Sequence, residues 1–278
     1  MPLVEFTSLV FAGAFAAGLL GSLTGLGGGV VLIPLLTLGF HVDMRYAMGA
    51  SLVSVIATSS GAAAAYVREG YSNVRIGMFL EVATTIGAVA GASLAAHTGT
   101  RWLAMVFGVV LLYSAWLSRS QQEHVAEGVA NQWSEKLRMS GEYPDGRGGT
   151  IAYAVDRITA GWATMFGAGV LSGLLGIGSG AVKVLAMDKI MRIPFKVSTT
   201  TSNFMIGVTA AASAGIYLAR GYVDPVLAAP VLLGVLLGSL VGAKALVRAR
   251  VPLLRTIFAW VIAALGVEMM VNGWMGRL

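Results

Sequence analysis

The chain contains no cysteine and few charged residues among its 278 positions. The absence of cysteine excludes disulfide bonds, thiolate chemistry, and zinc or iron–sulfur sites that are held by cysteine. Asp, Glu, Lys and Arg make up 12% of the residues, against about 25% in soluble domains. The three histidines, His41, His97 and His124, lie far apart in the sequence, each in an expected loop. We therefore expect no metal site and no cofactor.

Long apolar stretches dominate what is present. Apolar residues account for 56% of the chain, and the mean hydropathy is +0.79. The uncharged stretches are residues 6–40, 46–67, 158–182, 197–219 and 225–243. Because about 20 apolar residues span a bilayer as a helix, the sequence predicts an all-α polytopic membrane protein. The first residues, MPLVEF, lack the basic residues that open a signal peptide, so we expect the first segment to remain in the mature protein.

The sequence contains an internal repeat at a shift of 151 positions. This shift places residues 16–31 on residues 167–182 and continues without a gap for roughly a hundred residues. Besides several glycines, it pairs Phe15 with Phe166, Ser51 with Ser202, Thr58 with Thr209, Tyr66 with Tyr217 and Tyr71 with Tyr222. Chance similarity between apolar helices is the alternative, but it does not explain matched glycines and tyrosines. We expect two transmembrane repeats, residues 1–118 and 158–278, joined by a polar loop at 119–157.

Each repeat is expected to begin with a broken-helix hairpin. As one helix, residues 6–40 would be ~50 Å long, although the hydrocarbon core is only ~30 Å thick. The glycines at 25–29 and Pro34 both disfavour a continuous helix. We predict a hairpin that turns at Gly25–Gly29, then helices near residues 45–67, 74–97 and 101–117. The second repeat is expected to have a hairpin at 158–191 and helices near 196–219, 224–247 and 253–272, which gives 8–10 membrane segments in all.

Loop charges favour inverted over parallel repeats. In the inverted arrangement, and leaving the long loop aside, nine basic residues lie on one face and four on the other, and this bias marks the first face as cytoplasmic. The nine are Arg68, Arg75, Lys189, Arg192, Lys196, Lys244, Arg248, Arg250 and Arg255, and the four are Arg45, Arg101, Arg220 and Arg277. We predict a cytoplasmic loop at 119–157, solvated and with at most one short helix near 121–139, and both termini outside. The net charge of +6 is then explained by cytoplasmic loops rather than by a nucleic-acid partner.

Interrupted helices at matching positions of inverted repeats point to a transporter's site at the bilayer midplane. A helix that begins inside the membrane directs unpaired N–H groups and a partial positive charge towards the gap, which suits an anion. Lys183 adds a full charge one turn into the second return helix. The predicted substrate-binding residues are Gly25, Gly27, Gly28, Gly29, Ser51, Gly176, Gly178, Ser179, Gly180, Lys183, Thr200, Thr201, Ser202 and Asn203.

Several of these residues have alternative interpretations. Lys183 could instead reach the interface or pair with Asp188, although an intramembrane lysine is usually functional. Ser51 and Ser202 suit helix packing as well as ligand binding. Glu81 either carries a coupling proton or pairs with Arg75, and the ion pair is slightly favoured.

The tyrosines and the glycine clusters do not indicate further ligand-binding or catalytic sites. The four tyrosines of the repeat lie at helix ends and fit interfacial anchors. We expect no enzyme, since Lys183 does not follow a glycine as in a P-loop and no strand precedes the first glycine cluster.

The stretches GLLGSLTGLGGGVVLIPLL and AMGAS, with the later GLLGIGSGAVKVLAMDKIMRIPFKVSTTTSN, resemble the sulfite exporter TauE/SafE family of membrane permeases. This resemblance implies transport of small sulfur-containing anions, such as sulfite or organosulfonates, across the bacterial cytoplasmic membrane. It assigns the hallmark glycines to positions 25–29 and 176–180. The second copy has Ser179 in place of a glycine and Leu185 in place of Pro34, so we expect its return helix to be less kinked.

We therefore expect a secondary transporter that exports such anions by alternating access, driven by the proton gradient or the membrane potential. An anion channel, or a permease for another small carboxylate or oxyanion, is the alternative. The expected partners are the small anion, the lipid bilayer and a second copy of the chain in a homodimer, without nucleic acid.

Overall fold

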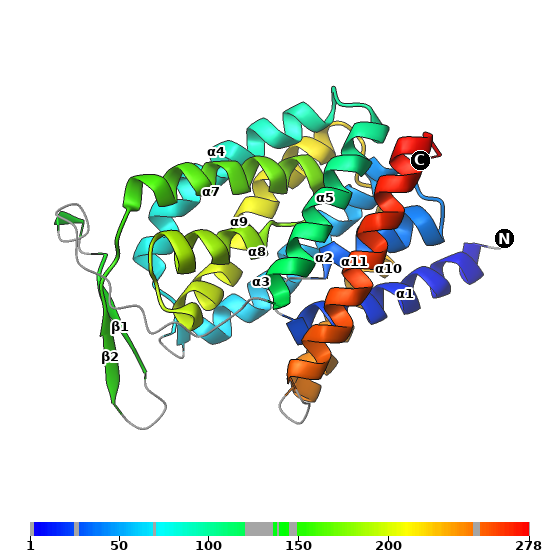
Figure 1. Ribbon diagram of the computed structural model, residues 1–278. Helices are drawn as coiled ribbons and strands as arrows, with labels where there is room; N and C mark the ends of the chain where they lie inside the picture. The colour runs from blue at the N-terminus through cyan, green and yellow to red at the C-terminus, as the bar shows by residue number, and fades with distance from the viewer. Residues whose placement is uncertain are drawn as a thin grey trace.

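The computed structural model describes residues 3–24, 28–68, 71–119, 136–137, 139–144, 149–246 and 251–277. Most of these residues are helical (Figure 1). The first half contains α1 (Leu3–Thr24), α2 (Gly29–Pro34), the π-helix η1 (Leu35–Gly39), α3 (Met44–Arg68), α4 (Val74–Ala95) and α5 (Thr100–Arg119). The second contains α7 (Ile158–Leu175), α8 (Gly180–Leu185), the π-helix η2 (Ala186–Ile190), α9 (Phe195–Ala219), α10 (Pro225–Leu246) and α11 (Val251–Met275). Between them lie β1 (Gly141–Pro144) and β2 (Thr150–Tyr153).

The element boundaries follow the 151-residue shift of the sequence. Both ends of α2, η1, α3 and α4 coincide under this shift with both ends of α8, η2, α9 and α10, and the first residue of α5 coincides with that of α11. The shared glycines and polar turn residues start and stop the helices at the same places in each half. The repeat in the sequence is therefore also a repeat of secondary structure.

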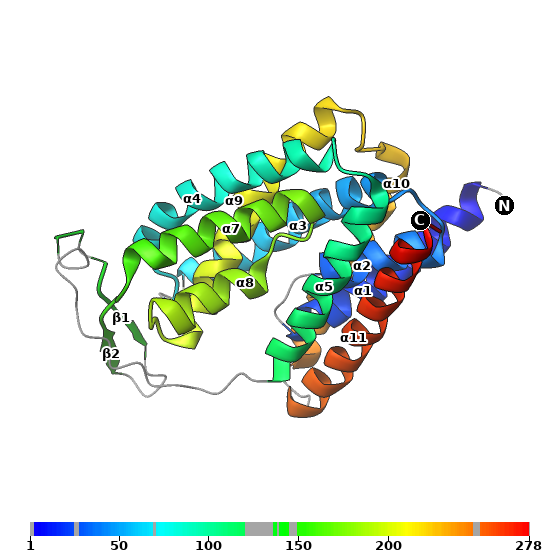
Figure 2. The ribbon, with the colours of Figure 1, turned by 45° about the horizontal axis from the view of Figure 1, so that its top comes forward.

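The helices pack mainly across the two halves. The extensive pairs are α1 with α10, α4 with α7, α3 with α9, and α5 with α11, and each pair takes one helix from each half (Figures 1 and 2). Exchanging the halves turns the α1–α10 pair into the α7–α4 pair and maps the other two pairs onto themselves. The packing thus has an approximate two-fold symmetry.

Equivalent helices run antiparallel. Near the start of α3, the Met48 sulfur accepts a hydrogen bond from Tyr217 near the end of α9, at 3.7 Å. Beyond the other end of α3, the Tyr71 carbonyl accepts one from Thr200 near the start of α9, at 2.9 Å. Inverted repeats require this direction, whereas the orientation of the halves across a membrane stays a prediction.

Glycines bring the paired helices into close contact. A Cβ at Gly87 in α4 would overlap the Phe166 carbonyl oxygen in α7, and a Cβ at Gly238 in α10 would overlap the Phe15 carbonyl oxygen in α1. These two contacts are equivalent under the 151-residue shift. Small residues at helix interfaces are typical of membrane proteins, where close backbone packing replaces the hydrophobic drive of water.

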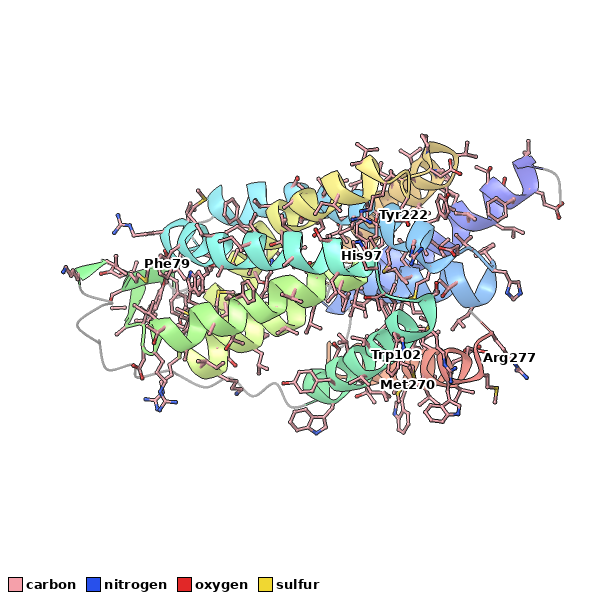
Figure 3. The ribbon with its side chains drawn as sticks, turned by 90° about the horizontal axis from the view of Figure 1, so that it is seen from above. Phe79, His97, Trp102, Tyr222, Met270 and Arg277 are labelled. Carbon is pink, nitrogen blue, oxygen red and sulfur yellow. The ribbon has the colours of Figure 1, made fainter. Side chains whose placement is uncertain are left out.

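The surface is that of a membrane protein. Five helical segments are long and apolar enough to cross a bilayer, namely Val4–Gly21, Val74–Ala95, Ile158–Leu175, Phe195–Ala219 and Pro225–Gly242. Shorter apolar helical segments are Gly29–Gly39, Thr100–Trp116 and Ala259–Met275. Large apolar side chains are exposed on the outside of the bundle, among them Trp102 on α5 (Figure 3). The prediction of an all-α polytopic membrane protein is confirmed.

The two return helices change pitch at the same position, contrary to expectation. Each changes from α to π at the same position, at Leu35 (φ −59°, ψ −46°) and at Ala186 (φ −61°, ψ −45°). The change of pitch occurs with Pro34 in the first half and with Leu185 in the second, so it does not depend on proline. The prediction of a less kinked second helix is wrong.

The end of the connecting loop is packed rather than solvated. Strands β1 and β2 pair antiparallel with Tyr143 opposite Ile151. Met139, Tyr153 and Val155 are buried in a cluster with residues of α4 and α7. The expectation of a solvated connector is therefore wrong for Met139, Tyr153 and Val155, while the short helix expected near 121–139 lies almost entirely outside the described residues.

Candidate functional site

The turns of the two hairpins touch each other. The second turn follows α7 and contains three residues with positive φ, Gly176 (+69°), Gly178 (+73°) and Ser179 (+46°). The first hairpin returns at Gly29, where a Cβ would lie 3.6 Å from the Cα of Ile177 in the second turn. Ser51 Oγ donates a hydrogen bond of 2.9 Å to the Gly176 carbonyl oxygen. The tips of the two hairpins therefore meet at one place.

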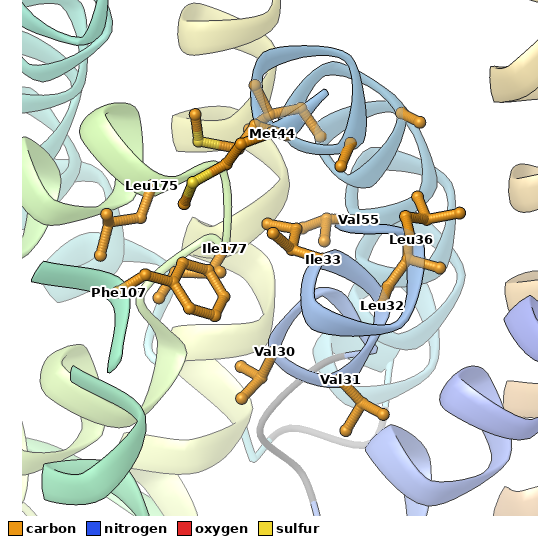
Figure 4. Close-up of a cluster of buried hydrophobic side chains, with 14 of the residues drawn as sticks. Val30, Val31, Leu32, Ile33, Leu36, Met44, Val55, Phe107, Leu175 and Ile177 are labelled. Carbon is orange, nitrogen blue, oxygen red and sulfur yellow. The ribbon is translucent and has the colours of Figure 1, made fainter. Parts of the chain in front are cut away.

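Apolar side chains surround this contact on the side of the first hairpin. Val30 and Ile33 of α2, Val55 of α3, Phe107 of α5 and Ile177 belong to one buried cluster (Figure 4). Gly28 and Gly29 are themselves buried. The other two predicted glycines of this hairpin, at positions 25 and 27, lie outside the described residues.

Lys183, in α8, is fully buried and binds polar side chains of α4 and α9. Its Nζ donates to Thr209 Oγ1 at 2.5 Å and lies 3.9 Å from Glu81 Oε2. The Thr209 hydroxyl in turn donates to Glu81 Oε1 at 2.5 Å. A threonine thus bridges an ion pair that joins the two halves.

This pairing overturns the alternative interpretations of both charges. Lys183 does not reach the surface, and the ion pair of Asp188 is with Lys189 at 3.5 Å. Glu81 is 5% exposed beside Lys183, whereas Arg75 is exposed at the start of α4. The favoured prediction of a Glu81–Arg75 pair is therefore wrong, because Glu81 points into the contact between α4, α8 and α9.

Hydroxyl groups complete the surroundings of the carboxylate. Thr85 donates to Glu81 Oε1 at 3.3 Å, and Thr84 Oγ1 lies 3.4 Å from Thr209 Oγ1. Glu81 Oε2 is buried without a hydrogen-bond partner among the described residues. Desolvating such a pair costs several kcal/mol per ion, so a buried ion pair is weak support for stability and points to a function.

Only one of the two equivalent positions carries these charges. Under the 151-residue shift, Lys183 corresponds to Leu32 and Glu81 to Leu232. Thr209 corresponds to Thr58, whose hydroxyl donates to the Ser54 carbonyl of its own helix at 3.0 Å. The backbone is nearly symmetric, but the polar site belongs to one side of it.

Several predicted hydroxyls lie near the second turn. Ser202 Oγ donates to the Gly180 carbonyl oxygen at 3.3 Å, at the first residue of α8. Ser179 is 4% exposed, and its Oγ has no hydrogen-bond partner among the described residues. Gly178 packs against Ile206 and Val55. The structure thus groups the second turn with Ser51, Ser202 and Lys183.

Other predicted residues bind elsewhere. Thr200 Oγ1 donates to the Tyr71 carbonyl oxygen, and Thr201 Oγ1 accepts from the Asn73 amide at 3.0 Å. Both threonines therefore hold the loop before α4, and Asn203 is half-buried. Tyr217, expected as an interfacial anchor, is 2% exposed and donates to the Gly173 carbonyl oxygen at 3.1 Å, so that prediction is wrong.

The sequence interpretation missed Thr209 and Thr84 as members of the site. Thr209 lies seven residues, or two helical turns, after Ser202, and Thr84 lies one turn after Glu81, so each pair shares a helix face. This helical spacing from Ser202 and Glu81 is the feature of the sequence that could have identified both threonines. Among the residues that the structure describes, no three His, Asp or Glu side chains are grouped to hold a metal ion.

Comparison with known proteins gives a family and two relatives. The family model of the sulfite exporter TauE/SafE matches residues 10–269. The chain is 26% identical over 277 residues to the probable membrane transporter protein YunE of Bacillus subtilis (strain 168), covering 97% of this chain and 99% of that one. It is 29% identical over 237 residues to the probable membrane transporter protein YdhB of the same organism, covering 85% and 89%. No solved structure matches.

Proposed function

Because this chain belongs to the sulfite exporter TauE/SafE family of membrane transporters, we propose that it exports small sulfur-containing oxyanions, such as sulfite or organosulfonates, by alternating access. The observation that carries the proposal is Lys183, a fully buried cation at the contact between the two halves. An ammonium group presents three N–H donors without an acceptor, which suits the oxygens of a sulfite or sulfonate group.

The anion replaces Glu81 as the partner of Lys183. Glu81 holds the ammonium only at 3.9 Å, and the Thr209 hydroxyl between them can turn its proton towards an incoming oxygen. The N–H groups at the start of α8 and the Ser179 Oγ, which has no partner in the described part of the chain, add donors from the second turn. Glu81, freed from Lys183, is the side chain that takes up a coupling proton.

A closed site supports a transporter rather than a channel. Lys183 is 0% exposed, and the hairpin tips touch at Gly29 and Ile177. Access from either side requires the halves to move relative to each other, which is how inverted repeats operate in secondary transporters. The contact between the tips is the barrier that such a movement opens.

Flux through proteoliposomes tests the proposal. Saturable efflux of radiolabelled sulfite is expected for the wild type, with a loss of at least about tenfold in Lys183→Ala. Lys189→Ala is the matched control, because it removes the same charge from the same return segment, where Lys189 pairs with Asp188. Equal flux in wild type and Lys183→Ala would refute the role of Lys183, and flux that does not saturate would show a channel.

The proposed topology has inverted repeats in the bacterial cytoplasmic membrane, a cytoplasmic connector and both termini outside. The nine-to-four charge bias supports it. The chain has no native cysteine, so single cysteines report on each side directly. Arg277→Cys is expected to react with an impermeant thiol reagent in intact cells, and Glu142→Cys only after permeabilisation. The reverse pattern would show the opposite orientation.

A further inference from the structure

Arg45, at the start of α3, lies against an aromatic ring from the other half. Its guanidinium carbon is 5.5 Å from the centroid of the Tyr222 ring, which Figure 3 labels. Nη2 donates to the Thr98 carbonyl oxygen at 3.0 Å, and Nη1 donates to the Tyr222 hydroxyl at 3.4 Å. Nε is buried and has no hydrogen-bond partner among the described residues. The Nε–H of this arginine is therefore one donor that a ligand can use.

A narrow hollow lies beside this arginine. Arg45, Arg220, Tyr217 and Tyr222 line it together with three alanines at the end of α4 and just after it, and its lining contains no carboxylate. The hollow is too narrow for a water molecule as it stands, so a ligand needs a lining side chain to move, and Arg220 is the exposed residue of the lining. Two guanidinium groups in a lining that has no carboxylate among the described residues favour an anion.

The same pair recurs at the opposite end of the molecule. Lys196 lies 5.0 Å from the centroid of the Tyr71 ring. The 151-residue shift relates Arg45 to Lys196 and Tyr71 to Tyr222, so the two cation–aromatic pairs are equivalent. Tyr71, but not Lys196, lines a surface depression of about 330 Å³ together with Arg75, Glu142 and Ser72; Lys196 faces this depression only across the Tyr71 ring. Ser72 Oγ is buried there without a hydrogen-bond partner among the described residues.

The two pairs lie on either side of the central site along α9. Thr209, which binds Lys183, lies 13 residues after Lys196 and 13 residues before Tyr222. At 1.5 Å per residue, Lys196 is ~20 Å from the central threonine along α9, and the other end of the helix, at Ala219, is ~15 Å from it. Three cationic side chains therefore lie on or beside α9. Lys196 is at its start, Lys183 is at its middle, and Arg45 is near its end.

We propose that the Arg45–Tyr222 and Lys196–Tyr71 pairs are equivalent entry sites for the transported oxyanion, one at each end of α9. The anion exchanges part of its hydration shell for the Nε–H of Arg45, or for the ammonium of Lys196, before it moves to Lys183. The aromatic ring holds the cation in place while no anion is bound. This inference rests on the proposed function, because it names the path by which the substrate of Lys183 arrives.

Single cysteines test the charge of each hollow without measuring transport. Ala96→Cys places a thiol in the first hollow and Ser72→Cys places one in the second, both in the cysteine-free chain. The rates of modification by an anionic sulfonatoethyl and a cationic trimethylammonioethyl methanethiosulfonate reagent are compared. Arg45→Gln is expected to lower the anionic-to-cationic ratio at Ala96→Cys at least about threefold, and Lys196→Gln to do so at Ser72→Cys. Arg45→Lys is expected to retain most of the ratio.

Arg101→Gln is the matched control for Ala96→Cys. Arg101 begins α5 near the same end, but its guanidinium donates to the Trp274 carbonyl oxygen at 2.7 Å, away from the hollow. Removing that charge is expected to leave the ratio nearly unchanged. Ethanesulfonate, an unreactive sulfonate, is expected to slow modification at both thiols.

An unchanged ratio in Arg45→Gln, no protection by ethanesulfonate, or a response in only one hollow would overturn the proposal of two equivalent sites. The readout does not depend on flux. If Lys183→Ala transports sulfite like the wild type while the ratios shift as expected, the proposed central role of Lys183 fails and the entry sites stand.

Discussion

Lys183 and Glu81 come from different halves of the chain, lie 3.9 Å apart, and have side chains that are 0% and 6% exposed. A buried pair of this kind is expensive to desolvate, and here a threonine hydroxyl lies between its members. The pair therefore joins the two halves, and its lysine is a cation that an anion can bind.

Removing one member of this pair should destabilise the protein more than removing both. Lys183→Leu leaves Glu81 buried without its counter-charge, which is expected to cost about 3–5 kcal/mol. The double variant Glu81→Leu/Lys183→Leu replaces the ion pair by leucines, as at the positions related to it by the 151-residue shift, Leu232 and Leu32. It should regain most of the stability. Thermal unfolding in detergent measures both, and transport should be lost in both. A double variant as unstable as the single one would contradict this explanation.

Glycines in α7 should differ sharply in their tolerance of alanine. A Cβ at Gly169 would overlap the Thr84 carbonyl oxygen of α4, so Gly169→Ala should cost about 1–3 kcal/mol by overpacking. Gly167, two residues earlier, has open space at the same position and serves as the control. Gly167→Ala should be neutral or stabilising by up to about 1 kcal/mol, because alanine is the better helix former. Equal melting temperatures for the two variants would show that α4 and α7 do not pack this closely.

The contact between the hairpin tips should show coupling between Gly29 and Ser51. A Cβ at Gly29 would lie 2.6 Å from Ser51 Oγ, so Gly29→Ala should lower both the melting temperature and sulfite flux. Ser51→Ala alone loses the hydrogen bond to Gly176, at a cost of about 1 kcal/mol. The double variant should be less impaired than the sum of the two, since the colliding oxygen is gone. If the effects of the two single variants were strictly additive, Gly29 and Ser51 would not be in contact.

The folded end of the connector should depend on Asn73. Its Oδ1 accepts from the Ile76 amide at the start of α4, and its Nδ2 donates to the Tyr153 hydroxyl at 2.7 Å. Asn73→Ala should cost about 1–2 kcal/mol, and Tyr153→Phe less, because it removes only one of these bonds. Hydrogen exchange at residues 139–144 and 149–155 should rise in Asn73→Ala. Unchanged exchange there would show that β1 and β2 are held by other contacts.

The same tyrosine gives a pH dependence. Burial raises the pKa of the Tyr153 hydroxyl above its ordinary value of 10.0. The unfolded chain then releases this proton at a lower pH than the folded chain, so the contribution is complete below pH 10 and is lost as the pH rises above it. Melting temperatures near pH 8 and pH 11 should differ less for Tyr153→Phe than for the wild type.

Much of the helical architecture could be predicted because it is encoded locally. The uncharged runs, the glycine turns at 25–29 and 176–180, and the repeat fixed the helices to within a few residues. Lys183 was identifiable because a charge in an apolar run is rare. The pitch change at Leu35 and Ala186 was not predictable from proline, because the backbone makes it with or without Pro34.

The partners of Lys183 could not be found in the same way. Glu81 and Thr209 meet it only because α4 and α9 cross between the halves, and no local pattern records that crossing. Hydroxyls such as Thr84 are common in apolar helices, where they often bond to their own backbone. The hairpin of β1 and β2 was missed because its polar sequence reads as a loop.

The packing of each half on the other has a consequence for how the protein is made. The glycine faces of α1 and α4 pack on α10 and α7, and none of these partners exists when the first half leaves the ribosome. Helices α1 and α4 are therefore expected to enter the bilayer before their closest contacts can form. These contacts form only when α7 and α10 of the second half have been inserted. The assembly of the chain therefore resembles that of a dimer whose two subunits are synthesised one after the other. The connector keeps the second half close to the first.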